Sequence, residues 1–336
     1  MDWSKGYTAG YYLSVIDPKS WSGYGMLNKL KEGTISLSDE NLRASADIKG
    51  ESLEIDSEYW IRIYLDARSK NGNNELVPLF TGLTNVPKKS TSEGFLVSIE
   101  CYSVLKPASD VLMPLGWYAK AGSNGARLIK ELLEKVTPAP VIIEGESEYL
   151  SNNVVAESGE TYLTMVDYIL SIIGWRLRLE GDGTIVLSEQ PTTLSAIFSA
   201  TQNDILEPEV NVETNWFDCP NVFRASTENM FAVARDEDPD SFLSIPSRGR
   251  EVWMEESDVA LNENETLSQY ANRRLKEEQK IVTSISYKRR FDPNVKPTDI
   301  VDIRYSKQNI DGLYYVKSQK IELSHGTPVS EEVSNI

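Results

Sequence analysis

Residues 175–187 read Trp175-Arg176-Leu177-Arg178-Leu179-Glu180-Gly181-Asp182-Gly183-Thr184-Ile185-Val186-Leu187. Two runs of strand-forming residues flank a glycine-rich turn, and this pattern predicts a β-hairpin. Apolar residues at helical spacing precede it and Gly174 is suited to end a helix, so we expect a helix over residues 161–173. A second helix, capped by Ser123, is expected from Ala126 to Val136. Residues 107–205 are therefore predicted to form an α/β domain.

The segments on both sides of this domain have β patterning. Three stretches of the first hundred residues alternate between apolar and more polar side chains, with period two. Their apolar sets are Tyr7, Ala9, Tyr11, Leu13 and Val15, then Tyr59, Ile61, Ile63 and Leu65, then Phe95, Val97, Ile99 and Cys101. Short connections between such strands favour a small antiparallel barrel or sandwich over residues 1–106.

After residue 206 strands are expected again, at 221–225 paired with 230–233, at 281–287, at 299–305 and at 313–316. A loop and helix at about 236–280 interrupt them, with Asn262 and Glu265 as a capping box. Residues 330–336 are interpreted as a polar tail. The predicted fold is α+β and mainly β: two small antiparallel β-barrels, 1–106 and 206–336, separated by an α/β insertion domain, 107–205.

Composition narrows the function classes. The chain has 336 residues, with 34 basic and 51 acidic side chains and a net charge of −17. Proteins that grip nucleic acid place Lys and Arg on phosphates, so this balance argues against such binding. Two cysteines and one histidine leave too few ligands for a zinc site. No apolar run is long enough to cross a bilayer and no secretion signal is recognised, so we expect synthesis in the cytoplasm and no membrane partner.

Tests for catalytic chemistry give no candidate. His325 next to Gly326 is interpreted as a turn residue, because no serine lies in a nucleophile elbow. Ser103 and Lys106 match a Ser-x-x-Lys spacing that arises often by chance, and its companion motifs are absent. Asp236, Asp238 and Asp240 have the opening spacing of a calcium loop, but Pro239 and Ser247 break the pattern.

Two weaker patterns remain. Gly122-Ser123-Asn124-Gly125 is interpreted as a turn and helix cap, since it lacks the ending of a phosphate-binding loop. Trp21, Tyr24, Trp117 and Trp253 would favour carbohydrate binding if they lined one groove, although packing is the simpler use of these residues. We therefore predict no catalytic, cofactor-binding or metal-binding residues, and a protein that is not an enzyme.

An ordered set of motifs in the carboxyl-terminal half resembles the hub proteins of phage tails and contractile injection systems, the family of the T4 hub, the Mu-type hub and XkdQ-like proteins. The motifs are Trp175-Arg176-Leu177 with Gly181 to Leu187, Asn221-Val222-Phe223, Gly249-Arg250, Ala271 to Leu275, Lys296 to Val301, Gly312 to Val316 and Leu323 to Gly326. Relatives commonly have Pro-Gly-Asp where this chain has Pro297-Thr298-Asp299. Proline can still begin the turn and Asp299 can still cap it, so the following strand is expected to form.

The resemblance implies a baseplate hub at the tail tip of a virion, assembled in the host cytoplasm. Three subunits would form a homotrimer whose six barrels make a pseudo-hexameric ring. This ring would join the six-fold tail tube, or a distal tail protein, to a three-fold central spike or fibre, with the tape-measure protein as a further candidate partner. DNA would pass through the lumen during ejection without specific binding. The alternatives are a carbohydrate-binding or glycosidase-type β-protein of the tail tip, and a tail-fibre adaptor.

Overall fold

A computed structural model of the chain describes residues 1–51, 55–90, 96–200, 203–206, 210–214, 216–259, 266–279, 283–306 and 309–335. Contacts divide the chain into two compact units. Unit 1 contains Met1–Asn211 and Ser286–Ser334, and unit 2 contains Val212–Ile285.

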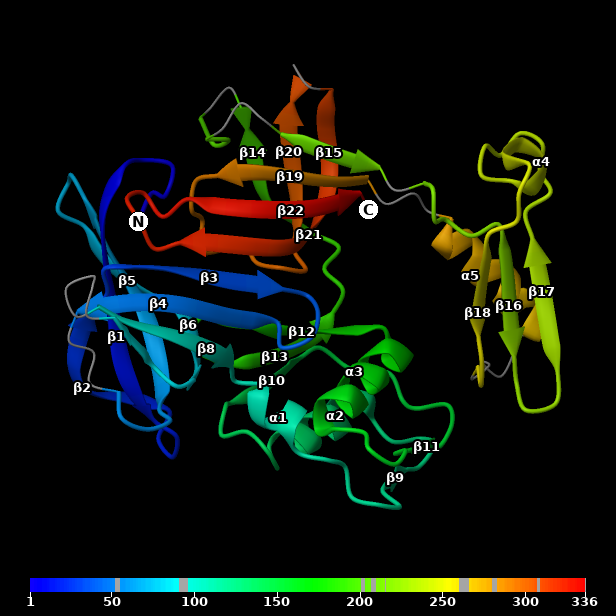
Figure 1. Cartoon of the computed structure of the whole chain (residues 1–336), viewed down its shortest axis with the longest axis horizontal. Helices are drawn as coiled ribbons and strands as arrows, with labels where there is room; N and C mark the ends of the chain where they lie inside the picture. The colour runs from blue at the N-terminus through cyan, green and yellow to red at the C-terminus, as the bar shows by residue number, and fades with distance from the viewer. Residues whose placement is uncertain are drawn as a thin grey trace. The chain divides into compact units, whose positions relative to one another are not determined.

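Fourteen strands join in one large sheet (Figure 1). The amino-terminal part contributes β1 (Tyr7–Asp17), β2 (Ser22–Lys29), β3 (Glu32–Ser38), β4 (Ala44–Glu51), β5 (Trp60–Ser69), β6 (Asn74–Thr84), β7 (Lys88–Ser90) and β8 (Leu96–Ser103). The carboxyl-terminal part contributes β14 (Leu194–Ser199), β15 (Asn211–Thr214), β19 (Thr283–Arg289), β20 (Ile300–Tyr305), β21 (Ile310–Glu322) and β22 (Val329–Asn335). The main path runs β15-β19-β22-β21-β3-β4-β8-β6-β5-β1-β2.

The two groups of strands meet where β21 pairs with β3. This antiparallel pairing sets Ile321 opposite Ile35 and Ser318 opposite Ser38. Because the last strand of one group pairs with a strand of the other, the described strands form one open path and neither group closes on itself. The mainly β prediction is confirmed, while the prediction of two closed barrels is not. Barrel closure depends on pairing between distant strands, and period-two patterns carry no information about it.

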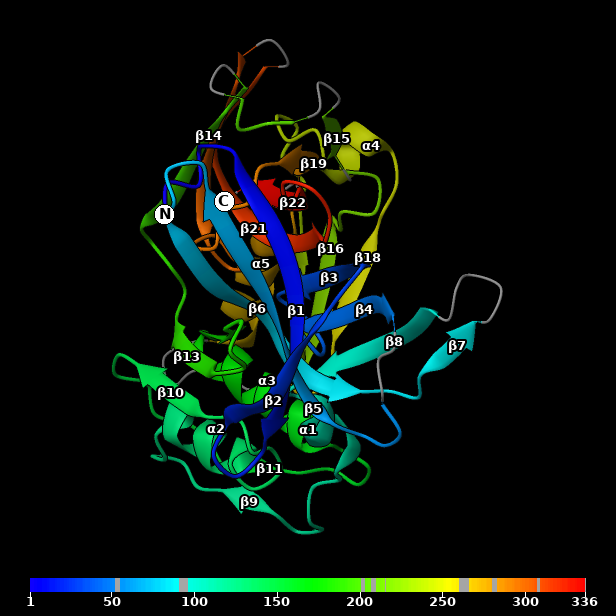
Figure 2. The same cartoon turned by 90° about the vertical axis from the view of Figure 1, so that its left-hand side faces the viewer.

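The core of the amino-terminal group follows the predicted alternation. Ile61, Ile63 and Leu65 are fully buried on β5, as is Cys101 on β8. Figure 2 shows β6, β5 and β1 running side by side, in agreement with their antiparallel registers. Burial raises the pKa of the Cys101 thiol, so this cysteine is an inert part of the core.

Two details of this core differ from the prediction. A register shift between β1 and β2 lies at Leu13–Val15, and beyond it Ile16 rather than Val15 is buried in the core. A bulge changes the face to which the following side chains point. The predicted core residue Phe95 lies outside the described residues.

The last residues form a strand, not the predicted polar tail. β22 buries Val329, Glu331 and Val333 on one face of the sheet. The polar composition of this segment suggested solvent exposure, but the Glu331 carboxylate is neutralised by a partner on β19. Burial of a charge requires such a partner, which cannot be recognised in the local sequence.

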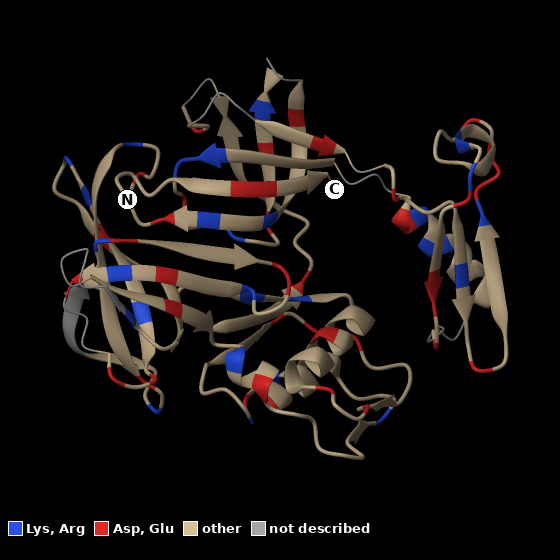
Figure 3. Cartoon of the chain, viewed as in Figure 1, with Lys and Arg blue, Asp and Glu red and all other residues tan. Residues whose placement is uncertain are grey.

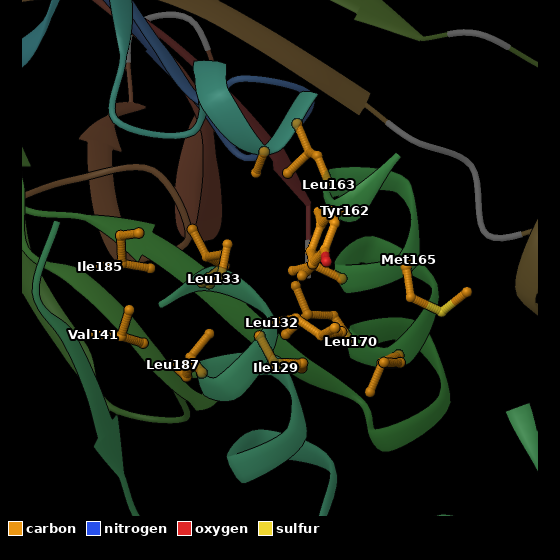
Figure 4. Packing of buried hydrophobic residues seen from close by; sticks show 14 of the residues in the cluster. Ile129, Leu132, Leu133, Val141, Tyr162, Leu163, Met165, Leu170, Ile185 and Leu187 are labelled. Carbon is orange, nitrogen blue, oxygen red and sulfur yellow. The ribbon is translucent and has the colours of Figure 1, made fainter. Parts of the chain in front are cut away.

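Between the two groups of strands lies the α/β part of unit 1. It contains α1 (Lys106–Asp110), β9 (Tyr118–Ala119), α2 (Gly125–Leu133), β10 (Val141–Glu144), β11 (Val154–Val155), α3 (Tyr162–Ile173), β12 (Trp175–Leu179) and β13 (Ile185–Glu189). The predicted hairpin is confirmed, with Leu179 opposite Ile185, and β10 adds to it in parallel. Side chains of α2 and α3 pack with those of the strands in one core (Figure 4).

The predicted helices are confirmed, with one change of cap. α3 begins after Thr161, which forms a capping box with Thr164, and ends at Gly174 in the left-handed conformation. α2 is capped by Asn124, whose side chain accepts from the Arg127 N–H, and not by Ser123. A Cβ on Gly125 would lie 2.5 Å from Ile173, so glycine is needed where α2 approaches α3.

Unit 2 contains a three-stranded sheet and one long helix. Its elements are β16 (Val222–Ser226), β17 (Phe231–Arg235), α4 (Ile245–Arg248), β18 (Trp253–Glu256) and α5 (Leu267–Glu278). β16 pairs with β17 antiparallel, as predicted, and with β18 in parallel. The predicted capping box at Asn262 and Glu265 lies outside the described residues, and α5 is instead capped by Thr266 together with Gln269.

Among the helices that the structure describes, none has the length and apolar character needed to span a membrane.

Candidate functional site

An open groove of about 770 Å³ lies in unit 1, on the sheet that both groups of strands share. Hydroxyl groups from six strands reach its wall. They belong to Ser36, Ser38, Ser45, Tyr102, Ser286, Ser318 and Ser330. The cross-strand register puts Ser36 beside both Ser45 and Lys320, so the polar side chains form a continuous surface across the seam. We call this surface the polar face.

Acidic and basic residues are interspersed along the strands of this sheet (Figure 3), and those on the polar face are predominantly acidic. On β3, β4, β8, β19, β21 and β22 the outward positions carry six acidic and three basic side chains. These are Glu32, Asp47, Glu51, Glu100, Glu322 and Glu332, against Lys49, Lys288 and Lys320. Lys49 pairs with Glu32 at 2.8 Å, and Lys288 with Glu322 at 3.2 Å. The excess of three carboxylates gives this surface no cationic cluster with which to hold phosphates.

A fully buried ion pair lies beneath the polar face. The Glu331 carboxylate accepts from Arg289 Nε at 2.9 Å and Nη2 at 2.5 Å, from Gln319 Nε2 at 2.6 Å, and from the Tyr287 hydroxyl. The Arg289 guanidinium packs 4.6 Å from the ring centre of Phe198. Burial by itself would lower the pKa of Arg289, but the Glu331 charge outweighs it and the pKa is raised. The network ties together β14, β19, β21 and β22.

The tip of the predicted hairpin forms a second polar junction, against the amino-terminal strands. The Asp182 carbonyl accepts from Trp21 Nε1 at 2.9 Å and from Arg62 Nη2 at 2.6 Å. The Gly181 carbonyl accepts from Thr81 Oγ1 at 2.8 Å. Glycine is required at position 181 for steric reasons, because a Cβ on Gly181 would lie 1.9 Å from the Pro78 carbonyl oxygen. The hairpin turn therefore serves as a docking element as well as a chain reversal.

Glu180 extends this junction to the carboxyl-terminal strands. Its carboxylate accepts from Arg178 Nε at 2.9 Å and from Lys296 Nζ. Burial lowers the pKa of Lys296 to about 8, and the neighbouring charge of Arg178 acts in the same direction. The junction thus connects the α/β part with both groups of strands.

A cavity of about 300 Å³ lies beside the junction, with walls from Phe80, Leu179, Phe291 and Ile321. Its cationic and amide side chains are bonded to protein groups: Lys296 to Glu180, and Arg289 and Gln319 to Glu331. Since these donors are occupied, they offer a ligand no unpaired group.

The turn at Pro297-Thr298-Asp299 forms as predicted. The Asp299 carboxylate accepts from the Lys296 N–H at 2.9 Å, and β20 begins at the next residue. Thr298, which stands where relatives commonly have glycine, has a φ of +81°. A β-branched residue in this region is strained.

We expect Thr298→Gly to raise the free energy of unfolding by about 1 kcal/mol, because relief of backbone strain outweighs the added freedom of the unfolded chain. Urea unfolding of the full chain measures this change. Thr298→Ala retains a Cβ at the same φ and is expected to be no more stable than the wild type. If the Thr298→Gly chain were less stable than the Thr298→Ala chain, the proposed backbone strain at residue 298 would be wrong.

His325 lies exposed in the turn that joins β21 to β22. Two tyrosines of β1 hold this turn. Tyr11 Oη donates to the Ser324 carbonyl and lies 2.7 Å from Thr327 Oγ1, and Tyr7 Oη donates to the Gly326 carbonyl. Burial raises the pKa of Tyr11 to about 12.

The raised pKa of Tyr11 predicts a loss of stability in alkaline solution. The unfolded value is about 10, so the contribution of Tyr11 is fully present below pH 10 and is lost as the pH rises toward 12. We expect the unfolding free energy of Tyr11→Phe to fall less steeply than that of the wild type between pH 10 and 11.5. Urea titrations at several pH values measure both slopes. Below pH 9 the two curves should run parallel, and equal slopes above pH 10 would contradict the prediction.

The other residues weighed for chemistry have structural uses. The Ser103 side chain is buried and donates to the Leu42 carbonyl, while Lys106 pairs with Asp110 on α1. The Asp236 carboxylate accepts from the Asp238 N–H, from Ser241 Oγ and from Gln279 Nε2. Within the described residues no group of three or more His, Cys, Asp or Glu side chains is arranged to hold a metal ion.

The four aromatic residues considered for carbohydrate binding have different surroundings. Trp21 packs against Trp60 and binds the hairpin tip, while Trp117 contacts the core of the α/β part. Tyr24 is exposed on β2. Trp253 lies in unit 2 on β18, against the Arg235 guanidinium. The surface that the structure does define, the polar face, was missed by sequence reasoning because its hydroxyl side chains are distributed over six strands.

Three solved structures are similar to this chain over almost its whole length. A tail protein from Neisseria meningitidis MC58 has a TM-score of 0.72 at 14% identity, covering 98% of this chain and 97% of that one. The 43 kDa tail protein of prophage MuSo2 from Shewanella oneidensis has a TM-score of 0.69 at 14% identity, covering 96% and 97%. The E. coli c3393 protein, a type VI secretion component described as similar to the T4 tail proteins gp27 and gp5, has a TM-score of 0.52 at 9% identity, covering 96% and 76%.

This chain therefore has the fold of phage tail proteins. No protein-family model matches its sequence, and no curated protein does.

Proposed function

We propose that this chain is a structural, non-enzymatic hub of a phage tail tip or baseplate, and thus a component of the virion. The supporting observation is the seam between β21 and β3, where strands from the two ends of the chain join in one sheet. Each subunit then supplies two β modules side by side. Three subunits supply six modules, enough to match a six-fold tail tube above while retaining three-fold symmetry for a spike or fibre below.

Open strand edges support closure of such a ring. β2 stands at one end of the main strand path, and an unpaired edge strand is a template for pairing with another chain. Pairing between subunits would satisfy the backbone groups of that edge and protect it from uncontrolled aggregation.

The polar face supports a channel for DNA. We propose that it faces the lumen of the ring, where its excess of carboxylates and its hydroxyl groups would discourage phosphates from adhering. The tail tube or distal tail protein, the central spike or fibre and the tape-measure protein are the proposed neighbours.

Copy number and symmetry test the hub proposal. Native mass spectrometry of the purified full chain is expected to give three copies, and electron microscopy of that species a ring with six similar lobes. A monomer at every concentration, or a closed assembly of another copy number, would refute the ring.

A further inference from the structure

Within the described residues of unit 2, α5 is the helix that packs on the sheet, and it covers one face. Phe223 and Ala225 of β16 point to α5, where they pack with Tyr270, Ala271 and Leu275. Neighbouring positions along a strand point to opposite faces, so Arg224 of β16 lies on the other side of the sheet. The cross-strand register puts Val233 of β17 and Glu255 of β18 on either side of Arg224.

We call this uncovered side the open face. It consists of Arg224, Phe231, Val233, Arg235, Trp253 and Glu255. Phe231 is 73% exposed and Trp253 is 49% exposed, although both are large apolar side chains. Aromatic residues and arginine are the types enriched at the centres of protein interfaces. The composition of the open face is therefore that of a docking surface.

Charges on and beside the open face balance locally. Arg224 pairs with Glu255, and Arg235 pairs with Glu251 at 2.5 Å. The Arg235 guanidinium also lies 5.4 Å from the ring centre of Trp253. The surface thus combines apolar side chains with equal numbers of positive and negative groups, in a chain whose net charge is −17.

We infer that the open face of unit 2 docks against a second copy of this chain. Copies with a charge of −17 repel one another, so they approach most readily where local charge is balanced and apolar area can be buried. β17 also forms an edge of its sheet, and its sequence Phe-Ala-Val-Ala-Arg lacks the lysine or proline that usually protects an edge. The inference rests on the proposed function in that a ring requires copies of the chain to meet.

A second exposed apolar patch lies on the α/β part and differs in charge. It includes Leu115, which is 87% exposed, with Tyr118 opposite Val155 on the β9–β11 ribbon. Glu157 and Glu160 lie on the segment that is hydrogen-bonded to this loop. Like charges there oppose contact between identical chains, so this patch provides a matched control.

The test measures self-association of the full chain by sedimentation velocity over a range of concentrations. Phe231→Glu puts a charge in place of the most exposed apolar side chain of the open face, and Trp253→Ser removes an aromatic contact. Each is expected to raise the dissociation constant of the assembly at least tenfold, whereas Leu115→Glu is expected to leave it unchanged. Hydrogen exchange across β16 and α5 shows whether unit 2 remains folded in the variants.

The outcomes separate this inference from the ring. If the wild type is a trimer and both open-face variants remain trimers with native hydrogen exchange, the inference is wrong and the ring proposal is unaffected. A wild-type dimer that Phe231→Glu and Trp253→Ser dissociate supports the inference and refutes the ring. A trimer weakened by both variants but not by Leu115→Glu supports both proposals, and a wild-type monomer refutes both.

Discussion

Gly181→Ala is expected to lower the free energy of unfolding by about 3 kcal/mol, the upper part of the usual range for overpacking a filled site. The added Cβ would lie 1.9 Å from the Pro78 carbonyl oxygen and 2.6 Å from the carbonyl carbon. Backbone cannot rotate away as a side chain can, so the hairpin tip must lift from the amino-terminal strands. Its hydrogen bonds from Trp21, Arg62 and Thr81 would be lengthened or lost. Urea unfolding measures the loss, and faster hydrogen exchange at residues 180–183 locates it.

Gly6→Ala is the control for this experiment. A Cβ on Gly6 meets no atom within 4 Å and its φ is not positive, so we expect a change within about 0.5 kcal/mol. Equal stabilities of the two variants would mean that the hairpin tip does not dock on β6 as described.

Glu331→Gln is expected to cost about 3–5 kcal/mol of unfolding free energy, because it leaves the buried Arg289 charge without its counterion. The substitution preserves the size of the side chain, so the loss reports charge rather than packing. Denaturant unfolding measures it, together with the solvent exposure of β22 by hydrogen exchange.

Two further variants test whether the loss in Glu331→Gln comes from the unpaired charge of Arg289. Glu332→Gln changes the neighbouring outward residue and is expected to be within about 0.5 kcal/mol of wild type. The double variant Arg289→Met with Glu331→Leu removes both charges and is expected to recover most of the loss. A double variant as unstable as Glu331→Gln would show that shape, not charge pairing, governs this position.

Patterns confined to a few turns were predicted well. The helix ending at Gly174, the hairpin at residues 175–187 and the pairing of β16 with β17 all depend on neighbours within about ten residues. The cap of α2 lies one residue later than predicted, at Asn124, because Ser123 and Asn124 are both good caps and the local sequence does not choose between them.

Features that depend on distant partners were not predicted. The strand β22 looks like a tail because its burial requires Arg289, which lies 42 residues earlier in the chain. The polar face was missed for the same reason, because hydroxyl side chains of six strands form a common surface only when β21 pairs with β3. The use of the hairpin turn for docking is visible only from the atoms of Pro78, Trp21 and Arg62.

The sequence by itself determined the helices α2 and α3, the hairpin of β12 and β13, the buried face of β5 and the negative charge of the whole chain, since periodicity and composition are local or additive properties. The tertiary structure alone decided that strands from both ends of the chain share one open sheet, that Arg289 and Glu331 are buried together, and that the sheet of unit 2 keeps one face uncovered. All three features depend on which distant segments of the chain pair with one another. Bringing such segments together costs loop-closure entropy, and the summed free energy of many contacts, not any single motif, compensates for it.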